Sequence, residues 1–350
     1  MKKILSLIIA TMMIVALSAC ASTPDAEVAP EADTASAAND LVDDAIPDDP
    51  ATGVTPDDDE ILIVFTNLDE SFEFCISVRE GIETEVARRG WNLVNMDNQL
   101  DGTISLANTR SAVELGADLI IKFNPDSAIA PAIMDIVTEA GIPTIAVDIP
   151  LPGAPYFGAN NFVAGEVGGV ALAELGLEEF GPEIDFLVVV TRPDGGELII
   201  ERQDGIIAGA RELYPDLTDD QIIILDGRGD VLPSQEVFTA FLTANPDATR
   251  ILVGSVNDQS GQGAFAAAEI ANRQDHVLII SQGADTSALD NLRMPERNAW
   301  RGSVSYAPEL YGYFMMPTVE LMLAGEPFPM YTYVDHFIVT WDNINDIYPQ

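Results

Sequence analysis

Two hydrophobic patterns alternate along most of this chain. Short runs rich in Ile, Val and Leu are followed by a turn with Gly, Pro, Asn or Asp and then by a longer amphipathic stretch. The apolar runs predict strands at 61–66, 92–96, 119–123, 144–147, 186–191, 222–225, 251–256 and 277–281. The amphipathic stretches predict helices at 72–89, 128–140, 163–180, 197–214, 235–244 and 259–272. Because these strands are almost continuously apolar, we expect parallel sheets covered by helices on both faces, which is the doubly wound α/β class.

The number of strands predicts two lobes. Eight principal strands are many for one small doubly wound domain, and a loop at 158–161 divides them into two sets of four. The residues that follow position 60 are enough for two domains of ordinary size with substantial cores. We therefore expect two similar Rossmann-like lobes.

The N-terminus has the pattern of an export signal. Lys2 and Lys3 precede an apolar run over 4–17, which then meets Ser18, Ala19 and Cys20. The run is too short for a stable membrane-spanning helix, and small residues mark a cleavage point. The sequence at 17–20 also resembles a bacterial lipobox, which implies a signal peptide at 1–19 and a lipid on Cys20. A plain secreted protein and an uncleaved anchor helix remain alternatives.

Residues 20–60 have the composition of a tether. The stretch 21–60 contains thirteen acidic residues and no Lys or Arg, and it is rich in Ala, Pro, Ser and Thr. Such a segment buries too little apolar surface to offset the entropy of ordering, and its like charges extend it. We therefore expect an acidic, disordered tether that separates the folded part from the membrane.

The net charge and the cysteines narrow the possible partners. The formal net charge is −41, and a surface of this sign repels nucleic acids and anionic lipid headgroups. Besides Cys20 the chain has one cysteine, Cys75, so no intramolecular disulfide forms once Cys20 is acylated. Cys75 lies in an expected helix and is interpreted as a packed small side chain.

Polar residues gather at the carboxyl ends of the expected strands. Ligands of open α/β sheets bind outside these ends, so this position selects candidate residues. The candidates are Asn67, Asp69, Asn124, Asp126, Asp148, Asn160, Asn161, Arg192, Asp194, Asn257, Asp258, Gln282 and Asp285. Carboxylates, amides and a guanidinium suit a polyhydroxylated ligand, because each hydroxyl both donates and accepts hydrogen bonds. Phe72 and Phe74 could contact the C–H faces of such a ring. Asp and Asn after a strand are also common helix N-caps, which is the preferred interpretation of Asp126 and Asp194.

Several motifs, in a fixed order along the chain, resemble those of a known family. They are Phe72-Glu73-Phe74 with Gly81, the stretch 116–121 leading to Asn124-Pro125, the stretch 141–148, the stretch 201–205, Val256-Asn257-Asp258 with Gly263-Ala264, Gln282-Gly283, and the stretch 323–326. Together they resemble the ribose- and galactose-type periplasmic solute-binding proteins, which share their fold with lactose-repressor-like effector domains. A regulator of that type would begin with a DNA-binding helix-turn-helix, whereas this chain begins with an export signal and an acidic tether.

The resemblance implies a fold in which the chain crosses between the lobes three times, which we expect near Asn161, Ser303 and Tyr331. The N-terminal lobe would then comprise 61–161 plus 304–331, and the C-terminal lobe 162–303 plus 332–350.

The resemblance also implies roles for individual residues. Asp148 and Arg202 would bind hydroxyls from opposite lobes, and Asn257, Gln282 and Tyr306 would line further parts of the pocket. Ile149 stands where ribose binders have an arginine, Gln282 where they have an aspartate, and Tyr306 where they have a glutamine. These departures leave the identity of the sugar open.

The resulting expectation is a solute-binding protein of the periplasm or cell exterior. It would be a monomer that captures a monosaccharide or polyol and delivers it to an ABC transporter permease, with no cofactor, metal or catalysis. The expected ligand-binding residues are Asn67, Asp69, Phe72, Phe74, Asp148, Asn160, Arg202, Asn257, Asp258, Gln282 and Tyr306. A sensor that docks on a chemoreceptor or histidine kinase is the alternative, and a glycosidase is a weaker one.

The enzyme classes find little support in the motifs. The two histidines, His276 and His336, have no metal-ligand or nucleophile spacing, and neither a Gly-x-Ser-x-Gly elbow nor a phosphate-binding loop occurs. Gly261-Gln262-Gly263 weakly resembles a dinucleotide fingerprint but is better explained as a helix N-terminus.

Overall fold

The structure is a computed structural model and describes residues 61–349. The interpretations of 1–19 as a signal peptide and of 20–60 as a lipidated Cys20 with a tether lie outside the described residues. Within 61–349, no helix is long and apolar enough to cross a membrane.

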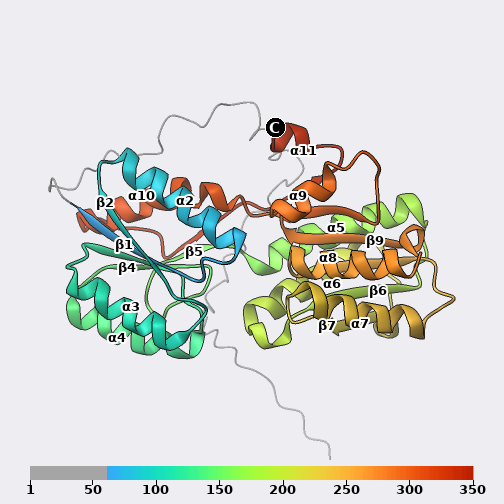
Figure 1. Ribbon diagram of the computed structural model, residues 1–350, viewed down its shortest axis with the longest axis horizontal. Coiled ribbons are helices and arrows are strands. Elements are labelled where there is room, and N and C mark those ends of the chain that lie inside the picture. The colour runs from blue at the N-terminus through green and yellow to red at the C-terminus, as the bar shows by residue number, and fades with distance from the viewer. Residues whose placement is uncertain (1–60, 350) are drawn as a thin grey trace, which may run out of the picture. The chain divides into compact units, whose positions relative to one another are not determined.

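The first sheet contains six parallel strands in the order β11-β5-β4-β3-β1-β2. They are β1 (Leu62–Asn67), β2 (Asn92–Asp97), β3 (Leu119–Lys122), β4 (Thr144–Val147), β5 (Tyr156–Gly158) and β11 (Tyr331–Tyr333). Helices α2 (Glu73–Arg88) and α10 (Tyr311–Ala324) cover one face, and α3 (Gly102–Glu114) and α4 (Ala130–Ala140) cover the other (Figure 1). Alternate residues of β1 pack to opposite faces, with Ile63 toward α2 and Val64 toward α3 and α4.

The second sheet has the order β12-β10-β9-β8-β6-β7, and its edge strand β12 is antiparallel. Its strands are β6 (Phe186–Thr191), β7 (Ile222–Asp226), β8 (Ile251–Ser255), β9 (Val277–Gly283), β10 (Trp300–Ser305) and β12 (Phe337–Thr340). Helices α5 (Asn161–Glu179) and α6 (Glu197–Leu213) lie on one face, and α7 (Val231–Ala244) and α8 (Asp258–Ile270) on the other (Figure 1). Two short helices, α9 (Thr286–Leu292) and α11 (Ile344–Ile347), complete this lobe.

Helices α5 and α6 pack unusually closely, because glycines face each other across them. A Cβ atom on Gly165 would lie 2.1 Å from the backbone oxygen of Arg202, and one on Gly205 would lie 2.1 Å from the backbone oxygen of Phe162. Any larger residue would force the two backbones apart. The glycines thus fix the position of Arg202 relative to the start of α5.

The fold class expected from the sequence, two doubly wound α/β lobes, is confirmed. All eight expected strands are present, with ends that differ by up to two residues. Sequence patterns missed β5, β10, β11 and β12, and also α3, α9, α10 and α11. Strands of three or four residues, such as β5 and β11, are too short to show a hydrophobic period. The start of α7 lies at Val231, four residues before the expected one, since Asp230 caps the backbone N–H of Val231.

The chain passes between the two sheets three times. The first passage follows β5 at 159–160, the second follows β10 at 306–310, and the third lies between β11 and β12 at 334–336. Ser303 is inside β10 and Tyr331 begins β11, so the expected positions of the last two passages fall inside strands and are a few residues early. These passages were placed early because the sequence patterns did not reveal β10 and β11 as strands.

Candidate functional site

The main candidate site is a cleft at the carboxyl ends of both sheets. Its cavity has a volume of about 330 Å³, within the range of small-molecule sites. Residues that directly follow strands of each sheet contribute to the lining, as the strand-end argument predicts. The lining residues are Leu68, Phe72, Glu73, Phe74, Cys75, Leu100, Phe123, Pro125, Asp148, Ile149, Ala159, Asn161, Arg192, Gly195, Leu198, Ile199, Arg202, Gly229, Val256, Asn257, Gln259, Gln282, Gly283, Asp285 and Tyr306.

Asp148 follows β4 and is held in one orientation by the first lobe. Its Oδ1 atom accepts hydrogen bonds from the Ala159 backbone N–H at 3.0 Å and from the Tyr311 hydroxyl at 3.1 Å. Its backbone is left-handed, with a φ of 53°. Gly158, with a φ of 150°, is needed beside it because a Cβ there would lie 2.2 Å from Oδ1. Burial raises the pKa of Asp148, whereas the two hydrogen bonds and the Arg202 charge lower it. Burial is the largest effect, and the resulting pKa is about 6.

Arg202 reaches the cleft from α6 and is held by α5 and by Val256, the residue after β8. Its Nε and Nη2 atoms donate to Oδ1 of Asn161 at 3.1 and 2.5 Å, and Nη1 donates to the Val256 backbone oxygen at 2.7 Å. The guanidinium lies over the ring of Tyr306, 5.0 Å from its centroid. A cation–π contact and three hydrogen bonds therefore preorganise this side chain.

Tyr306 and Gln282 form a buried pair beneath Arg202. The Tyr306 hydroxyl donates to Oε1 of Gln282 at 2.5 Å, and Nε2 of Gln282 donates to the Ala164 backbone oxygen at 3.2 Å. Burial raises the pKa of Tyr306, so this hydroxyl stays neutral at physiological pH. The pair supports the guanidinium and ties the end of β9 to α5.

The two expected aromatic residues line the cleft near the start of α2. Phe72 is exposed and Phe74 is half-buried. The ring of Phe74 meets those of Tyr306 and Tyr311 edge-on, with centroids 6.2 and 5.7 Å apart. Phe74 thus contributes to the packed wall, and Phe72 has more of its surface available to a ligand.

Asn257 lines the cleft, but its amide is engaged as a helix cap. Oδ1 accepts from the Ser260 backbone N–H at 3.0 Å, and Nδ2 donates to the Gly229 backbone oxygen at 2.8 Å. Asp285 is similar, because it caps α9 and accepts from Gln259 at 2.7 Å.

Asp258 is the next residue in the chain, yet it points into the second lobe and does not line the cavity. Its carboxylate accepts from the hydroxyls of Ser281 and Ser303 at 2.5 and 2.6 Å and from the Asp285 backbone N–H at 2.8 Å. Burial, and then the nearby Asp285 carboxylate, raise its pKa. Asp258 therefore connects α8 to β9, β10 and the start of α9.

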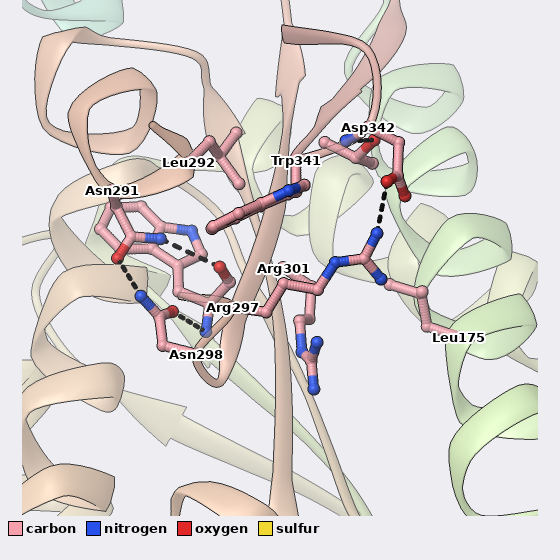
Figure 2. Close-up of a pocket in the computed structure, with 10 residues that line it drawn as sticks. Leu175, Asn291, Leu292, Arg297, Asn298, Arg301, Trp341 and Asp342 are labelled. Carbon is pink, nitrogen blue, oxygen red and sulfur yellow. Dashed lines mark hydrogen bonds and ion pairs between the residues drawn. The ribbon is translucent and has the colours of Figure 1, made fainter. Parts of the chain in front are cut away.

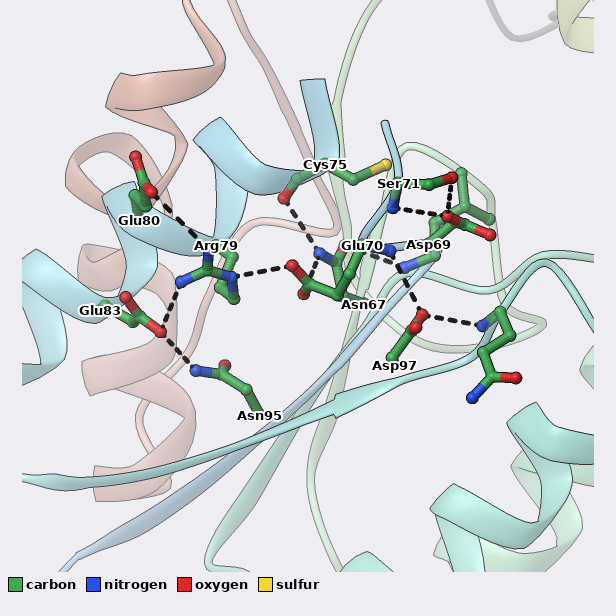
Figure 3. A network of polar contacts seen from close by, with 12 residues as sticks. Asn67, Asp69, Glu70, Ser71, Cys75, Arg79, Glu80, Glu83, Asn95 and Asp97 are labelled. Atoms are coloured by element: carbon green, nitrogen blue, oxygen red, sulfur yellow. Dashed lines mark hydrogen bonds and ion pairs between the residues drawn. The ribbon is translucent and has the colours of Figure 1, made fainter. Parts of the chain in front are cut away.

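Asn67 and Asp69 also lie outside the cavity lining. Asn67 donates to Glu70 and to the Cys75 backbone oxygen, and Asp69 accepts from the Ser71 backbone N–H at 2.7 Å (Figure 3). Figure 3 shows that both belong to a polar network which fixes the loop between β1 and α2.

Asn160 is the N-cap of α5 and is likewise outside the lining. Its side chain accepts from the Val163 backbone N–H at 3.3 Å. Of the other strand-end candidates, Asn161 and Arg192 line the cleft, while Asp126 caps a short helix and Asn124 is buried beside it.

Two residues near the passages between the sheets were not expected. Tyr311 orients Asp148, as described above. His336 accepts a hydrogen bond at Nε2 from the Asn160 backbone N–H at 3.1 Å, and its ring lies edge-on to Tyr306. Burial, and then the Arg202 charge, lower the pKa of His336 to about 3, so the ring is neutral. His336 thereby links the first and third passages, a contact across 176 positions of sequence.

A second hollow on the second lobe is much smaller, at about 60 Å³. Figure 2 shows its polar side chains bonded to each other: Asn298 donates to Asn291, and Arg297 pairs with Asp342. Its small size fits packing better than ligand binding. Among residues 61–349, no group of three His, Cys, Asp or Glu side chains is placed to hold a metal ion.

The two α/β lobes and a cleft lined by both define a two-lobed binding protein. Residues 63–327 match the family described as "Periplasmic binding protein domain", and the chain belongs to this family. It is 22% identical over 281 residues to the ribose import binding protein RbsB of Escherichia coli (strain K12), covering 77% of this chain and 86% of that protein.

Two solved structures show the same fold. One is an ABC transporter periplasmic solute-binding protein from Actinobacillus succinogenes 130z with bound D-allose, with a TM-score of 0.71, 20% identity, and coverage of 82% of this chain and 99% of that one. The other is a Caulobacter myo-inositol binding protein bound to myo-inositol, with a TM-score of 0.67, 22% identity, and coverage of 84% and 97%.

Proposed function

We propose that this protein is an extracytoplasmic solute-binding protein that captures a monosaccharide or related polyol in the cleft and delivers it to an ABC transporter permease. The observation that carries this proposal is the pair formed by Asp148 and Arg202, which line one cavity from different lobes and are each held in place by the protein. A sugar hydroxyl forms stronger hydrogen bonds with an ionised carboxylate or guanidinium than with a neutral side chain. The relatives named above are described as binding ribose, D-allose or myo-inositol, which belong to the proposed class.

The proposed site residues are those that line the cavity among the expected set. They are Phe72, Phe74, Asp148, Arg202, Asn257, Gln282 and Tyr306. We assign direct ligand contact to Phe72, Asp148 and Arg202. The others support the site, because their polar groups already bond to the protein.

Export and anchoring rest on the N-terminal sequence. We propose that residues 1–19 are removed, that Cys20 carries a lipid, and that residues 20–60 tether a monomeric binding unit to the outer side of a membrane. Labelling of growing cells with a radioactive fatty acid should mark the protein, and Cys20→Ala should abolish the label.

The ligand is identified by calorimetric titration of the purified protein with sugars, polyols, nucleosides and amino acids. Binding confined to sugars or polyols supports the proposal. Binding confined to nucleosides or amino acids would leave the fold unchanged and overturn the ligand class. We further propose that the protein does not hydrolyse sugars; release of a chromophore from nitrophenyl glycosides would contradict this.

A further inference from the structure

Six large aliphatic side chains from both lobes are part of the cleft wall. Leu68, Leu100 and Ile149 line it from the first lobe, and Leu198, Ile199 and Val256 line it from the second. A ring bearing hydroxyls around its whole edge would leave several of them against these side chains without partners, at a cost for each buried polar group.

The backbone and exposure of Leu100 give the most specific indication that this surface contacts apolar parts of a ligand. Both Gln99 and Leu100 have left-handed backbones, with φ values of 52° and 53°. This region is unfavourable for a leucine and is adopted readily by Gly and Asn. The strained Leu100 nevertheless leaves 44% of its surface exposed beside the cleft. An exposed leucine in a strained conformation becomes favourable when apolar ligand surface covers it.

Most amides and carboxylates of the cleft are already used by the protein. Gln282 bonds to Ala164 and Tyr306. Asn257 bonds to Ser260 and Gly229. These side chains shape the cavity, and they have little remaining capacity for a ligand with many hydroxyls.

Asp148 and Arg202 differ from these residues because each keeps hydrogen-bonding atoms that are available to a ligand. Within the described part of the chain, Oδ2 of Asp148 receives no hydrogen bond, since both bonds to this carboxylate go to Oδ1. Arg202 uses one hydrogen on each of its three nitrogens, so each terminal nitrogen keeps a second one. One acceptor on Asp148 and two donors on Arg202, which line the same cavity, match a pair of neighbouring hydroxyls.

We infer that the ligand is an amphipathic sugar: a neighbouring hydroxyl pair binds Asp148 and Arg202, and deoxy or methyl carbons face Leu100, Ile149, Leu198 and Ile199. This inference rests on the proposed function and narrows its ligand class to deoxy or alkylated sugars.

The test compares sugars that differ in one hydroxyl. The full-length protein is titrated by calorimetry with matched pairs of galactose, glucose and mannose configuration, each pair consisting of the hexose and its terminal-deoxy counterpart. A hydroxyl placed against an aliphatic wall lowers the affinity of the sugar about ten-fold or more. Within the pair of sugars that binds, the deoxy sugar should therefore bind at least ten-fold more tightly than the parent hexose. Equal or tighter binding of the parent hexose overturns the inference and leaves the proposed function intact. If no sugar or polyol binds, the proposed function fails and the inference fails with it.

A pair of variants assigns the preference to the cleft wall. Leu100→Asn places a polar residue that tolerates the left-handed backbone, so the protein should fold and the deoxy preference should fall several-fold. Leu115→Asn is the matched control, since Leu115 is 52% exposed at the end of α3 and does not line the cleft. Circular dichroism checks that both variants are folded. If folded Leu100→Asn keeps the full preference for the deoxy sugar, Leu100 does not contact the ligand.

Discussion

Replacing Lys122 with methionine should stabilise the protein at neutral pH. Lys122 lies in β3 and is fully buried, although it is the only lysine after Lys3 in the sequence. Its Nζ atom donates to the Ser105 backbone oxygen at 3.2 Å, and burial lowers its pKa from 10.5 to about 7. No carboxylate contributes to this shift, so an ammonium at this position has no countercharge.

The magnitude follows from the two pKa values. Between pH 7 and 10.5 the unfolded chain binds more protons at this site than the folded protein, so the free energy of unfolding rises with pH across this window. The titration of Lys122 therefore makes the free energy of unfolding about 4 kcal/mol lower at pH 7 than above pH 10.5.

Methionine has a similar shape and no charge, so Lys122→Met removes this penalty. The Ser105 oxygen keeps a hydrogen bond from the Thr109 hydroxyl at 2.8 Å, and the net gain at pH 7 should therefore be about 2–3 kcal/mol. Such a gain raises Tm by several degrees in a protein of this size.

The assay is urea unfolding of both proteins from pH 6 to 11. The wild type should gain stability up to pH 10.5 and the variant should have a flatter profile. Arg110→Met is the control, because it removes the same charge from an exposed position on α3. NMR titration of lysine amines, with the Lys122 signal assigned as the one missing in Lys122→Met, gives the pKa directly. A less stable variant at pH 7 together with a pKa above 9 would refute the reasoning.

Other predictions concern the cleft and the passages between the lobes. Ligand affinity should fall as the pH drops below about 6, because protonation removes the Asp148 charge; calorimetry at pH 5 and 7 checks this, and equal affinities contradict it. Arg202→Ala should weaken binding about ten-fold or more, since charge-assisted hydrogen bonds contribute roughly 1.5–3 kcal/mol, and unchanged affinity would exclude Arg202 from the site. The lowered pKa of His336 makes the unfolded chain bind more protons between pH 3 and 6.5, so the free energy of unfolding decreases as the pH falls through that window; His336→Gln should flatten this dependence in urea unfolding. Gly165→Ala should destabilise the protein by about 1–3 kcal/mol and weaken binding, because its methyl group collides with the Arg202 backbone; a fully stable variant would show that the helices can separate.

The sequence predicted the framework of the site well. Asp148 was expected at the cleft because it follows a strand, and Arg202 because of the family resemblance; both line the cavity. It was less informative about which strand-end side chains face the cleft. Asn257 and Asp258 are adjacent in the chain, yet the first lines the cavity and the second is buried against Ser281 and Ser303. The direction of each side chain depends on the backbone of the turn and on partners from distant strands.

The sequence by itself determined the two α/β lobes, most of their strands, and the residue types at the strand ends, because hydrophobic period and turn chemistry are local properties. Only the tertiary structure decided which of those side chains keep hydrogen-bonding atoms for a ligand. Tyr311 reaches Asp148 across 163 positions, and His336 reaches Asn160 across 176. Contacts of this range form only when late segments return to the first lobe, so no local pattern encodes them.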